Sequence, residues 1–264
     1  MSVLLSNPER VFWLGLMAAV GWAAQSFSAP ASLASAPPED GGKRPVLVEL
    51  FTSEGCSSCP PADALLARLD STQPIAGAQV IVLSEHVTYW NQLGWRDPFS
   101  SEAMTERQRR YGEQFGLSDV YTPQAVVDGA AELVGSDEHG LAKAIARAAS
   151  APKQQLTLAD VQSYGGAVHF LVRGAASSNT LLMAALAEDS VQSSVARGEN
   201  EGRTLRHVAV VRALQQMGKG VDDGRPLALK LPQSNQTGPM RLIVFLTSRD
   251  NGHVLAVSEQ AIAR

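Results

Sequence analysis

The first part of the chain alternates between short apolar runs and amphipathic segments. Residues 45–52 (PVLVELFT) and 78–87 (AQVIVLSEHV) are mostly apolar runs with the length of buried strands. Between them, Leu65, Leu66 and Leu69 fall on one face of a helix. A strand, a helix and a second strand in this order predict two parallel strands joined by a right-handed crossover.

Helix and hairpin signals follow these two strands. Residues 100–116 carry bulky side chains at three- and four-residue steps, which predicts an amphipathic helix. The Asp-Gly pair at 128–129 stands between two short apolar arms, a strong signal for a β-hairpin. Residues 136–150 predict another helix with Ser136 or Asp137 as its N-cap. The predicted order of this half is therefore β–α–β–α–β–β–α.

Beyond residue 152 the pattern changes to short strand-like runs. Between 155 and 260 these runs are divided by turn-forming residues, and apolar positions alternate with polar ones, as at 168–172. Several strands at short spacing predict an antiparallel sandwich. Residues 206–217 could instead be partly helical. The polar segment 197–203 (RGENEGR) is expected to be a solvated turn, with docking onto the first half or carboxylate binding as alternatives.

The N-terminal region has the composition of a secretory signal peptide. One arginine precedes fourteen uncharged residues (11–24), and small residues and prolines follow. That run is shorter than the ~20 residues a membrane-spanning helix needs. We expect a signal peptide over 1–31, cleaved after Ser28 or Ala31, then a linker over 32–43. The mature protein is expected to be periplasmic or secreted, and an uncleaved signal anchor is the alternative.

Length and charge limit the remaining function classes. The 264 residues can form one large core or two modest ones, with 45% hydrophobic and 18% charged residues. The formal net charge of −4 lacks the basic surface that nucleic-acid binding usually needs. Glycine-rich nucleotide loops, HExxH and GxSxG motifs are absent from the sequence.

The candidate chemistry centres on Cys56 and Cys59, the only cysteines in the chain. A helix N-terminus favours the thiolate, which is the reactive form. As a staple, a CxxC pair encloses so few residues that it removes little entropy from the unfolded chain. Pro60 and Pro61 follow, so the regular helix is expected to start near Pro60, with Cys56 in a tighter turn ahead of it. A redox-active dithiol, a metal clip and an inert disulfide remain open.

Two residues at the end of the second strand could assist the cysteines. The carboxyl ends of strands in α/β sheets face the site. His86 could act as a general base on Cys59, or complete a copper or zinc site with Cys56 and Cys59. Glu85 could handle protons instead, because neighbouring residues of a strand point to opposite faces. A hydrogen-bonded histidine at the edge of the core is the plainer interpretation.

An aromatic cluster follows directly. Tyr89, Trp90 and Trp95 lie in a segment rich in turn formers. Beside a reactive centre, such side chains could form an apolar platform for substrate. They could equally form a lid that packs down over the sheet.

The motifs together resemble those of known proteins. A CxxC pair at a strand-to-helix junction, followed by a hairpin whose first arm comes after a proline, resembles the thioredoxin fold. A more specific resemblance is to the thioredoxin-like, exported family called domain of unknown function 1223. It is carried by ELFTSEGCSSCPPAD (49–63), HVTYWNQLGWRDPFSS (86–101), RQRRYGEQFGLSDVYTPQAVVDG (107–129) and RGENEGRTLRHVAVVR (197–212).

The resemblance implies roles for four residues. Cys56 would be the exposed attacking thiol and Cys59 the resolving one. Pro123 would be a cis proline facing the dithiol, and the Thr122 backbone would be free to pair with a substrate peptide. An ordinary strand-initiating proline is the alternative.

We therefore expect a thioredoxin-like α/β domain over 44–151, followed by a β-rich, sandwich-like antiparallel domain over 152–264. The expected activity is thiol–disulfide exchange with another exported protein, with no cofactor beyond the dithiol. One alternative is a module that binds or delivers copper or zinc. Another is a non-catalytic interaction module in which the β-rich half binds the partner.

Overall fold

The computed structural model describes residues 42–174, 179–231 and 238–262. The predicted signal peptide and nearly all of the predicted linker lie outside these residues. The described residues belong to one compact unit, which covers residues 40–264. None of the described helices is long and apolar enough to cross a membrane.

The first half of the described chain has the element order predicted from the sequence. Its strands and helices are β1 (Arg44–Thr52), α1 (Pro60–Thr72), β2 (Ala78–His86), α2 (Glu102–Phe115), β3 (Gln124–Val127), β4 (Ala131–Val134) and α3 (Glu138–Ser150). A short 3-10 helix, η1 (Asn91–Leu93), lies in the aromatic segment. β1 and β2 pair in parallel, as the β–α–β order predicts.

Local sequence explains where these elements begin and turn. Helix α1 starts at Pro60, a position at which a missing backbone N–H costs little. The side chain of Asp137 caps α3 by accepting a hydrogen bond from the Gly140 N–H. Asp128 and Gly129 both have positive φ, as a tight hairpin turn between β3 and β4 requires. These three predictions are confirmed.

The second half consists of strands. They are β5 (Leu156–Tyr164), β6 (Ala167–Gly174), β7 (Thr180–Glu188), β8 (Val191–Ser194), β9 (Thr204–His207), β10 (Val210–Lys219), β11 (Leu227–Lys230), β12 (Met240–Ser248) and β13 (Val254–Ile262). The alternative of a partly helical segment at 206–217 is wrong, because β10 pairs with β7 along nearly its whole length.

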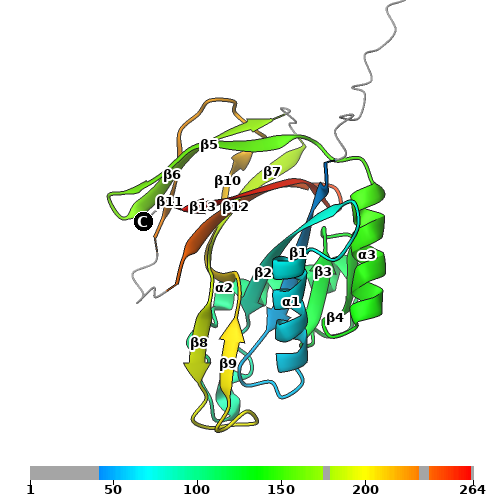
Figure 1. Ribbon diagram of the computed structural model, residues 1–264, viewed down its shortest axis with the longest axis vertical. Coiled ribbons are helices and arrows are strands. Elements are labelled where there is room, and N and C mark those ends of the chain that lie inside the picture. The colour runs from blue at the N-terminus through cyan, green and yellow to red at the C-terminus, as the bar shows by residue number, and fades with distance from the viewer. Residues whose placement is uncertain (1–41, 175–178, 232–237, 263–264) are drawn as a thin grey trace, which may run out of the picture. The chain divides into compact units, whose positions relative to one another are not determined.

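One mixed sheet runs through both halves (Figure 1). Its strand order is β13-β12-β7-β10-β2-β1-β3-β4, and β10 joins β2 in parallel at a single pair, Val210 with Ser84. A three-stranded sheet, β11-β6-β5, packs through an apolar cluster against β7, β12 and β13. The expected domain boundary at 151 and 152 falls between α3 and β5. That division stays a prediction, and strands from both sides of it share the sheet.

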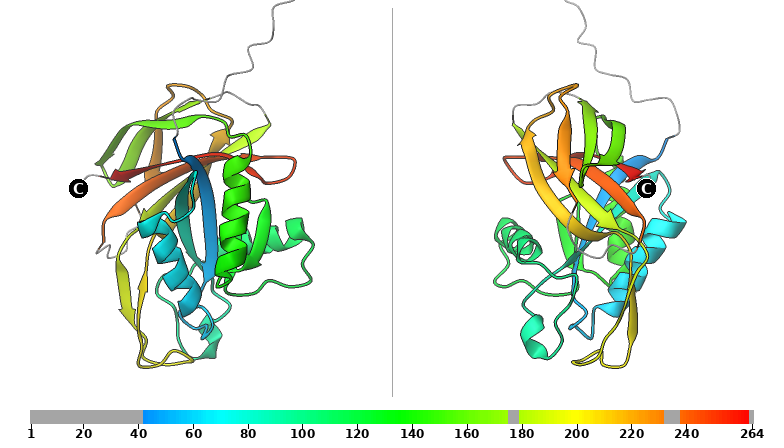
Figure 2. Two further views of the ribbon diagram at one scale, coloured as in Figure 1. Left: turned by 45° about the vertical axis from the view of Figure 1, so that its right-hand side comes forward. Right: turned by 90° about the vertical axis from the view of Figure 1, so that its left-hand side faces the viewer.

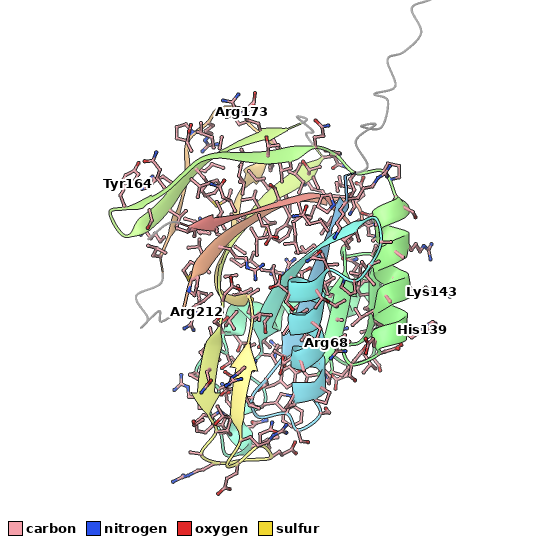
Figure 3. All side chains as sticks on the ribbon, in the orientation of Figure 1. Arg68, His139, Lys143, Tyr164, Arg173 and Arg212 are labelled. Atoms are coloured by element: carbon pink, nitrogen blue, oxygen red, sulfur yellow. A yellow bond between two sulfur atoms is a disulfide. The ribbon has the colours of Figure 1, made fainter. Side chains whose placement is uncertain are left out.

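The helices cover the two faces of the sheet differently. Figure 2 shows α1 and α3 on one side of β1 to β3 and α2 on the other. Polar side chains such as Arg68 on α1 and Lys143 on α3 lie on the outer surface of their helices (Figure 3). The largest apolar cluster includes Val48 and Val82 from the first half and Phe245 and Val257 from the second. A core shared in this way couples the two halves.

The shared core predicts cooperative unfolding. Phe245 is fully buried, so Phe245→Ala should lower the free energy of unfolding by about 3–5 kcal/mol. The apolar cluster of Phe245 reaches β1 and β2. The urea midpoints measured by tryptophan fluorescence and by circular dichroism should therefore both move to lower urea concentration by the same amount. Val134→Ala, at a half-exposed position, is the control and should change stability by about 1 kcal/mol or less. Two separated transitions would show that the halves unfold as independent domains.

Candidate functional site

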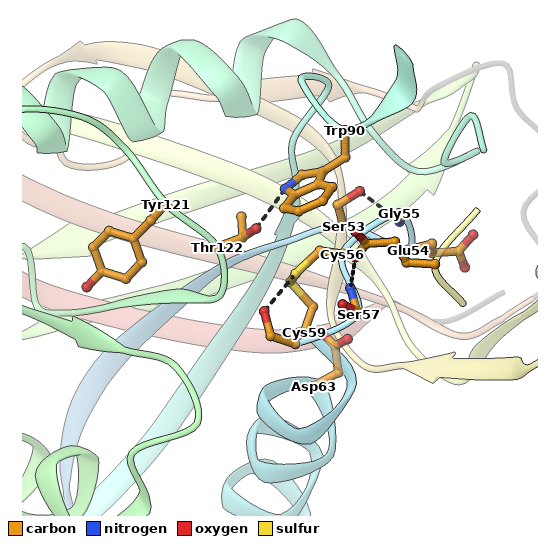
Figure 4. The surroundings of a disulfide bond; sticks show 12 residues. Ser53, Glu54, Gly55, Cys56, Ser57, Cys59, Asp63, Trp90, Tyr121 and Thr122 are labelled. Atoms are coloured by element: carbon orange, nitrogen blue, oxygen red, sulfur yellow. Dashed lines mark hydrogen bonds between the residues drawn. A yellow bond between two sulfur atoms is a disulfide. The ribbon is translucent and has the colours of Figure 1, made fainter. Parts of the chain in front are cut away.

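The two cysteines lie in a tight loop between β1 and α1. They form a disulfide with a Cα–Cα distance of 5.4 Å. Cys59 is the N-cap residue of α1, and its N–H donates to the Cys56 carbonyl at 3.2 Å. The Cys56 Sγ lies 3.4 Å from the Ser58 hydroxyl, as Figure 4 shows. The pair therefore sits at the carboxyl end of a central strand and the start of a helix.

Both cysteines are fully buried, with 0% of each residue exposed. The expectation that Cys56 is the exposed thiol is therefore wrong. Ser57 and Ser58, between the cysteines, are exposed. Trp90 lies over the loop (Figure 4). A Cβ atom added to Gly55 would lie 3.0 Å from the Cβ of Trp90, so the two residues are in close contact. The polar segment 197–203 also contacts the loop, through Asn200 and Glu199.

Asn200 fastens the segment 197–203 to the cysteine loop. Its Nδ2 donates to the carbonyls of Glu54 at 2.8 Å and Cys56 at 2.9 Å, and its side chain is fully buried. Arg203 orients this amide by donating to its Oδ1 at 2.7 Å. The Glu199 carboxylate accepts a hydrogen bond from the Ser57 N–H at 3.0 Å. Most of the segment is exposed, as a solvated turn should be, and Asn200 and Glu199 also dock it onto the first half, as the alternative predicted.

Glu54, two residues before Cys56, places a buried carboxylate under the loop. Its Oε2 accepts from the Trp95 indole at 2.8 Å. Its Oε1 accepts from the Ser193 hydroxyl and lies 3.2 Å from His207 Nε2. A buried carboxylate needs such partners, because taking an unpaired charge out of water is very costly. Three separate segments of the chain converge on this one side chain.

His207, at the end of β9, lies between two acidic side chains. Its Nδ1 is 3.8 Å from the Asp63 carboxylate on α1, and its Nε2 faces Glu54. Burial opposes a charged ring, but the two carboxylates outweigh it and raise the pKa of His207 to about 10. The protonated imidazole therefore compensates the buried acidic charge beside the cysteines.

Within the part of the chain that the structure describes, His86 makes no hydrogen bond to either sulfur, because its Nε2 is buried without a hydrogen-bond partner. Its Nδ1 hydrogen-bonds the Asp97 carboxylate at 2.7 Å, and its ring meets the His207 ring edge to face, with centroids 4.6 Å apart. Burial raises the pKa of Asp97, but His86 and the N–H groups of Glu54 and Phe99 outweigh it, so that pKa is lowered. His86 thus supports the loop through Asp97.

The alternative metal site is not assembled in the geometry. Within residues 42–174, 179–231 and 238–262, no three His, Cys, Asp or Glu side chains are grouped so that they could hold a metal ion. This includes the set of Cys56, Cys59 and His86. The cysteines are joined to each other, and the Nδ1 of His86 is engaged by Asp97.

Glu85 faces the opposite side of the sheet, as the alternation along β2 predicts. It lies beside Arg107 of α2, at 3.5 Å, and near Glu49. Burial and the Glu49 carboxylate raise the pKa of Glu85 well above its usual range. It belongs to the α2 face of the sheet.

The three aromatic residues pack down over the end of the sheet. Each is half-buried, and each polar group donates inward: Tyr89 to Gln108 at 3.2 Å, Trp90 to Thr122 at 2.8 Å, and Trp95 to Glu54. Because their polar ends are satisfied within the protein, the arrangement fits the lid interpretation better than an open platform.

Thr122 and Pro123 lie close to the same loop. The Thr122–Pro123 peptide is cis, as the resemblance implied. The Thr122 hydroxyl accepts the Trp90 indole N–H, and Figure 4 places both residues beside the disulfide. The Pro123 carbonyl accepts from the Gly135 N–H at 2.9 Å.

Sequence reasoning did not select several residues that build this site. Glu54, Asp63, Asn200 and His207 were not chosen as candidates. The unusual density of charged and amide side chains at 197–203 was the available signal, but nothing in the local pattern says what that segment contacts. The Asn200 contact joins positions 144 residues apart in the chain.

These features define a mostly β protein with a mixed sheet and a buried CxxC disulfide where a strand meets a helix. The chain belongs to the family described as "Protein of unknown function (DUF1223)", which matches residues 47–247. The family predicted from the sequence segments is confirmed.

Solved structures add one informative likeness. The crystal structure of a protein from Agrobacterium tumefaciens matches with 28% identity and a TM-score of 0.59, over 83% of this chain and 94% of that one. The alkylpurine DNA glycosylase AlkC of Pseudomonas fluorescens matches with 12% identity and a TM-score of 0.19, over 45% of this chain and 33% of that one. The second likeness is too weak to support any argument. No curated protein matches the chain.

The raised pKa of His207 predicts a pH-dependent contribution to stability. Its folded pKa of about 10 exceeds its ordinary value of 6.5. The stabilisation is therefore fully present below about pH 6.5 and is lost as the pH rises through about 10. In urea unfolding, the stability difference between wild type and His207→Gln should narrow over that interval, by on the order of a few kcal/mol.

The exposed His139 on α3 provides the matched control. His139→Gln should leave the pH profile of stability unchanged. If the difference in free energy of unfolding between wild type and His207→Gln stays constant between pH 6 and 10, His207 is not held in its charged form.

Proposed function

We propose that the protein is an exported thioredoxin-like thiol–disulfide oxidoreductase that acts through Cys56 and Cys59. The observation that carries the proposal is the position of the disulfide. The only two cysteines are paired at the N-cap of α1, where the pair joins no distant parts of the chain. Such a short loop gives a staple little stabilising effect, so a chemical role explains the pair better.

The β1–α1–β2–α2–β3–β4–α3 order supports the thioredoxin-like assignment, with the cysteines between β1 and α1. The predicted signal peptide supports export, and an oxidising compartment would keep the disulfide formed. The proposed partner is an exported protein with free thiols or a disulfide.

The exchange begins from the oxidised form. A partner thiolate attacks the Sγ of Cys56, forming an intermolecular disulfide and breaking the Cys56–Cys59 bond, with Cys59 leaving as a thiolate. A second partner thiolate then attacks the partner sulfur of that mixed disulfide. The partner is oxidised to a disulfide, and Cys56 leaves as the second thiolate. The same steps in reverse reduce a partner disulfide, and the midpoint potential sets the direction.

Burial of both sulfurs adds a requirement to this reaction. We call strands β8 and β9 and the segment 195–203 between them the cap. The cap closes over the cysteine loop through Asn200 and Glu199, so it must move before a partner sulfur reaches Cys56. A groove of about 440 Å³ separates α1 from β9, lined by Pro60 and Leu205 among others. The cap is held by these polar contacts together with its buried apolar side chains Val191, Val195 and Leu205.

The redox equilibrium of the cysteines tests the proposed activity. The protein is equilibrated with glutathione buffers of graded ratio, free thiols are alkylated, and the mass shift is measured. We expect a midpoint between roughly −120 and −270 mV, the range of known exchange catalysts. A disulfide reduced only below about −300 mV would identify a structural bridge and remove the enzymatic proposal.

Removing the Asn200 amide tests the role of the cap. Asn200→Ala deletes two buried hydrogen bonds to the cysteine loop, so dithiothreitol should reduce the disulfide about tenfold or more faster. The exposed neighbour Glu201 is the control, and Glu201→Ala should react like wild type. Thermal melting of each variant separates local opening from general destabilisation. Equal reduction rates in all three proteins would show that the cap does not limit access.

A further inference from the structure

A second cleft lies on the opposite side of the sheet from α1. It has a volume of about 530 Å³ and runs between α2 and strands β7, β10 and β12. Both views of Figure 2 place α2 beside the β12–β13 turn, at one end of this cleft. No residue of the cysteine loop or of the cap lines it. Its volume lies within the ~300–1,000 Å³ typical of sites for small molecules.

The walls of the cleft provide an apolar surface. Met104 of α2 is buried, and Leu181, Met183 and Leu214 from the sheet are half-buried. Methionine side chains are flexible and polarizable, so they adapt to ligands of differing shape. This surface suits an aliphatic or aromatic body.

The same cleft has three guanidinium groups. Arg107 is largely buried and held in place by Glu49, which accepts from its Nε at 2.6 Å. Tyr111 completes this arrangement by donating to the other Glu49 oxygen at 2.5 Å. Arg107 is therefore held in one position at the edge of the cleft, and the Glu49 carboxylate balances its charge.

Arg110 and Arg249 are exposed at the cleft and differ from Arg107 in one respect. Among the described residues, neither guanidinium has a carboxylate partner. The buried Glu85 lies behind Arg107, 3.5 Å from its Nε, and does not line the cleft. Of the residues that the structure describes, three arginines and no acidic residue line the cleft, so its lining is positively charged in a chain whose net charge is −4. Guanidinium groups bind carboxylates and phosphates through paired hydrogen bonds.

We infer that this cleft binds a small amphiphilic anion, with its carboxylate or phosphate head between Arg110 and Arg249. The apolar body of the ligand lies along Met104, Met183 and Leu214. This site is separate from the proposed exchange reaction, since it shares no lining residue with the cysteine loop or the cap. It gives the α2 face of the protein a binding role of its own.

Calorimetric titration of the purified protein with decanoate tests the inference. Decanoate, kept below its micellar concentration, should bind saturably with one site per chain. Acetate, which lacks the apolar body, and 1-decanol, which lacks the charge, should bind at least tenfold more weakly. Decyl phosphate is the second probe, and tighter binding by it than by decanoate would assign a phosphate head to the same site. Equal binding of 1-decanol and decanoate would overturn the inference.

Charge-removing variants locate the binding. The double substitution Arg110→Gln/Arg249→Gln should weaken decanoate at least tenfold, because each lost charge-assisted hydrogen bond is worth several-fold in affinity. Arg109→Gln is the matched control on the same helix, since Arg109 pairs with Glu102 and Glu106 and does not line the cleft. Undiminished binding in the double variant, with its fold verified by circular dichroism, would place the ligand elsewhere and overturn the inference. Disulfide reduction should be unaffected by all three substitutions, so this result and the redox result are independent.

Discussion

The need to compensate the buried carboxylate of Glu54 organises the region around the cysteines. A carboxylate two residues before Cys56 cannot lose its hydration without charged or hydrogen-bonding partners. Trp95, Ser193 and His207 supply them from three different segments. Glu54 thus contacts both the aromatic lid and the cap, and Asn200 and Glu199 attach the cap to the cysteine loop as well. The disulfide lies buried among these contacts.

The continuous sheet makes the attachment possible. Strand β10 returns beside β2 at Val210 and Ser84, so the cap, which precedes β10, reaches the end of β1. The β-rich half then has a definite role near the dithiol: it supplies Asn200 and His207 to the site. In the proposed exchange reaction, this part of the chain would control access to the sulfurs.

The two faces of the sheet separate two kinds of chemistry. Along β2, His86 faces the side of Asp97 and His207, while its neighbour Glu85 faces Arg107 and α2. The strand alternation that keeps these groups apart also keeps their charges apart. The cysteine site is consequently rich in acidic groups and histidine, whereas the α2 cleft carries unpaired arginines.

The sequence by itself determined the local elements and the chemistry available to them. Apolar runs and turn signals predicted β1, α1 and the Asp128–Gly129 hairpin, because these depend on residues close together in the chain. The cysteine spacing likewise predicted that Cys56 and Cys59 lie close together, and left a dithiol, a metal clip and a disulfide open. Only the tertiary structure decided that both cysteines are buried, that Asn200 holds their loop and that His207 lies between two carboxylates. Those outcomes depend on contacts between residues about 140 to 150 positions apart, and no local periodicity encodes which distant segment will supply a partner.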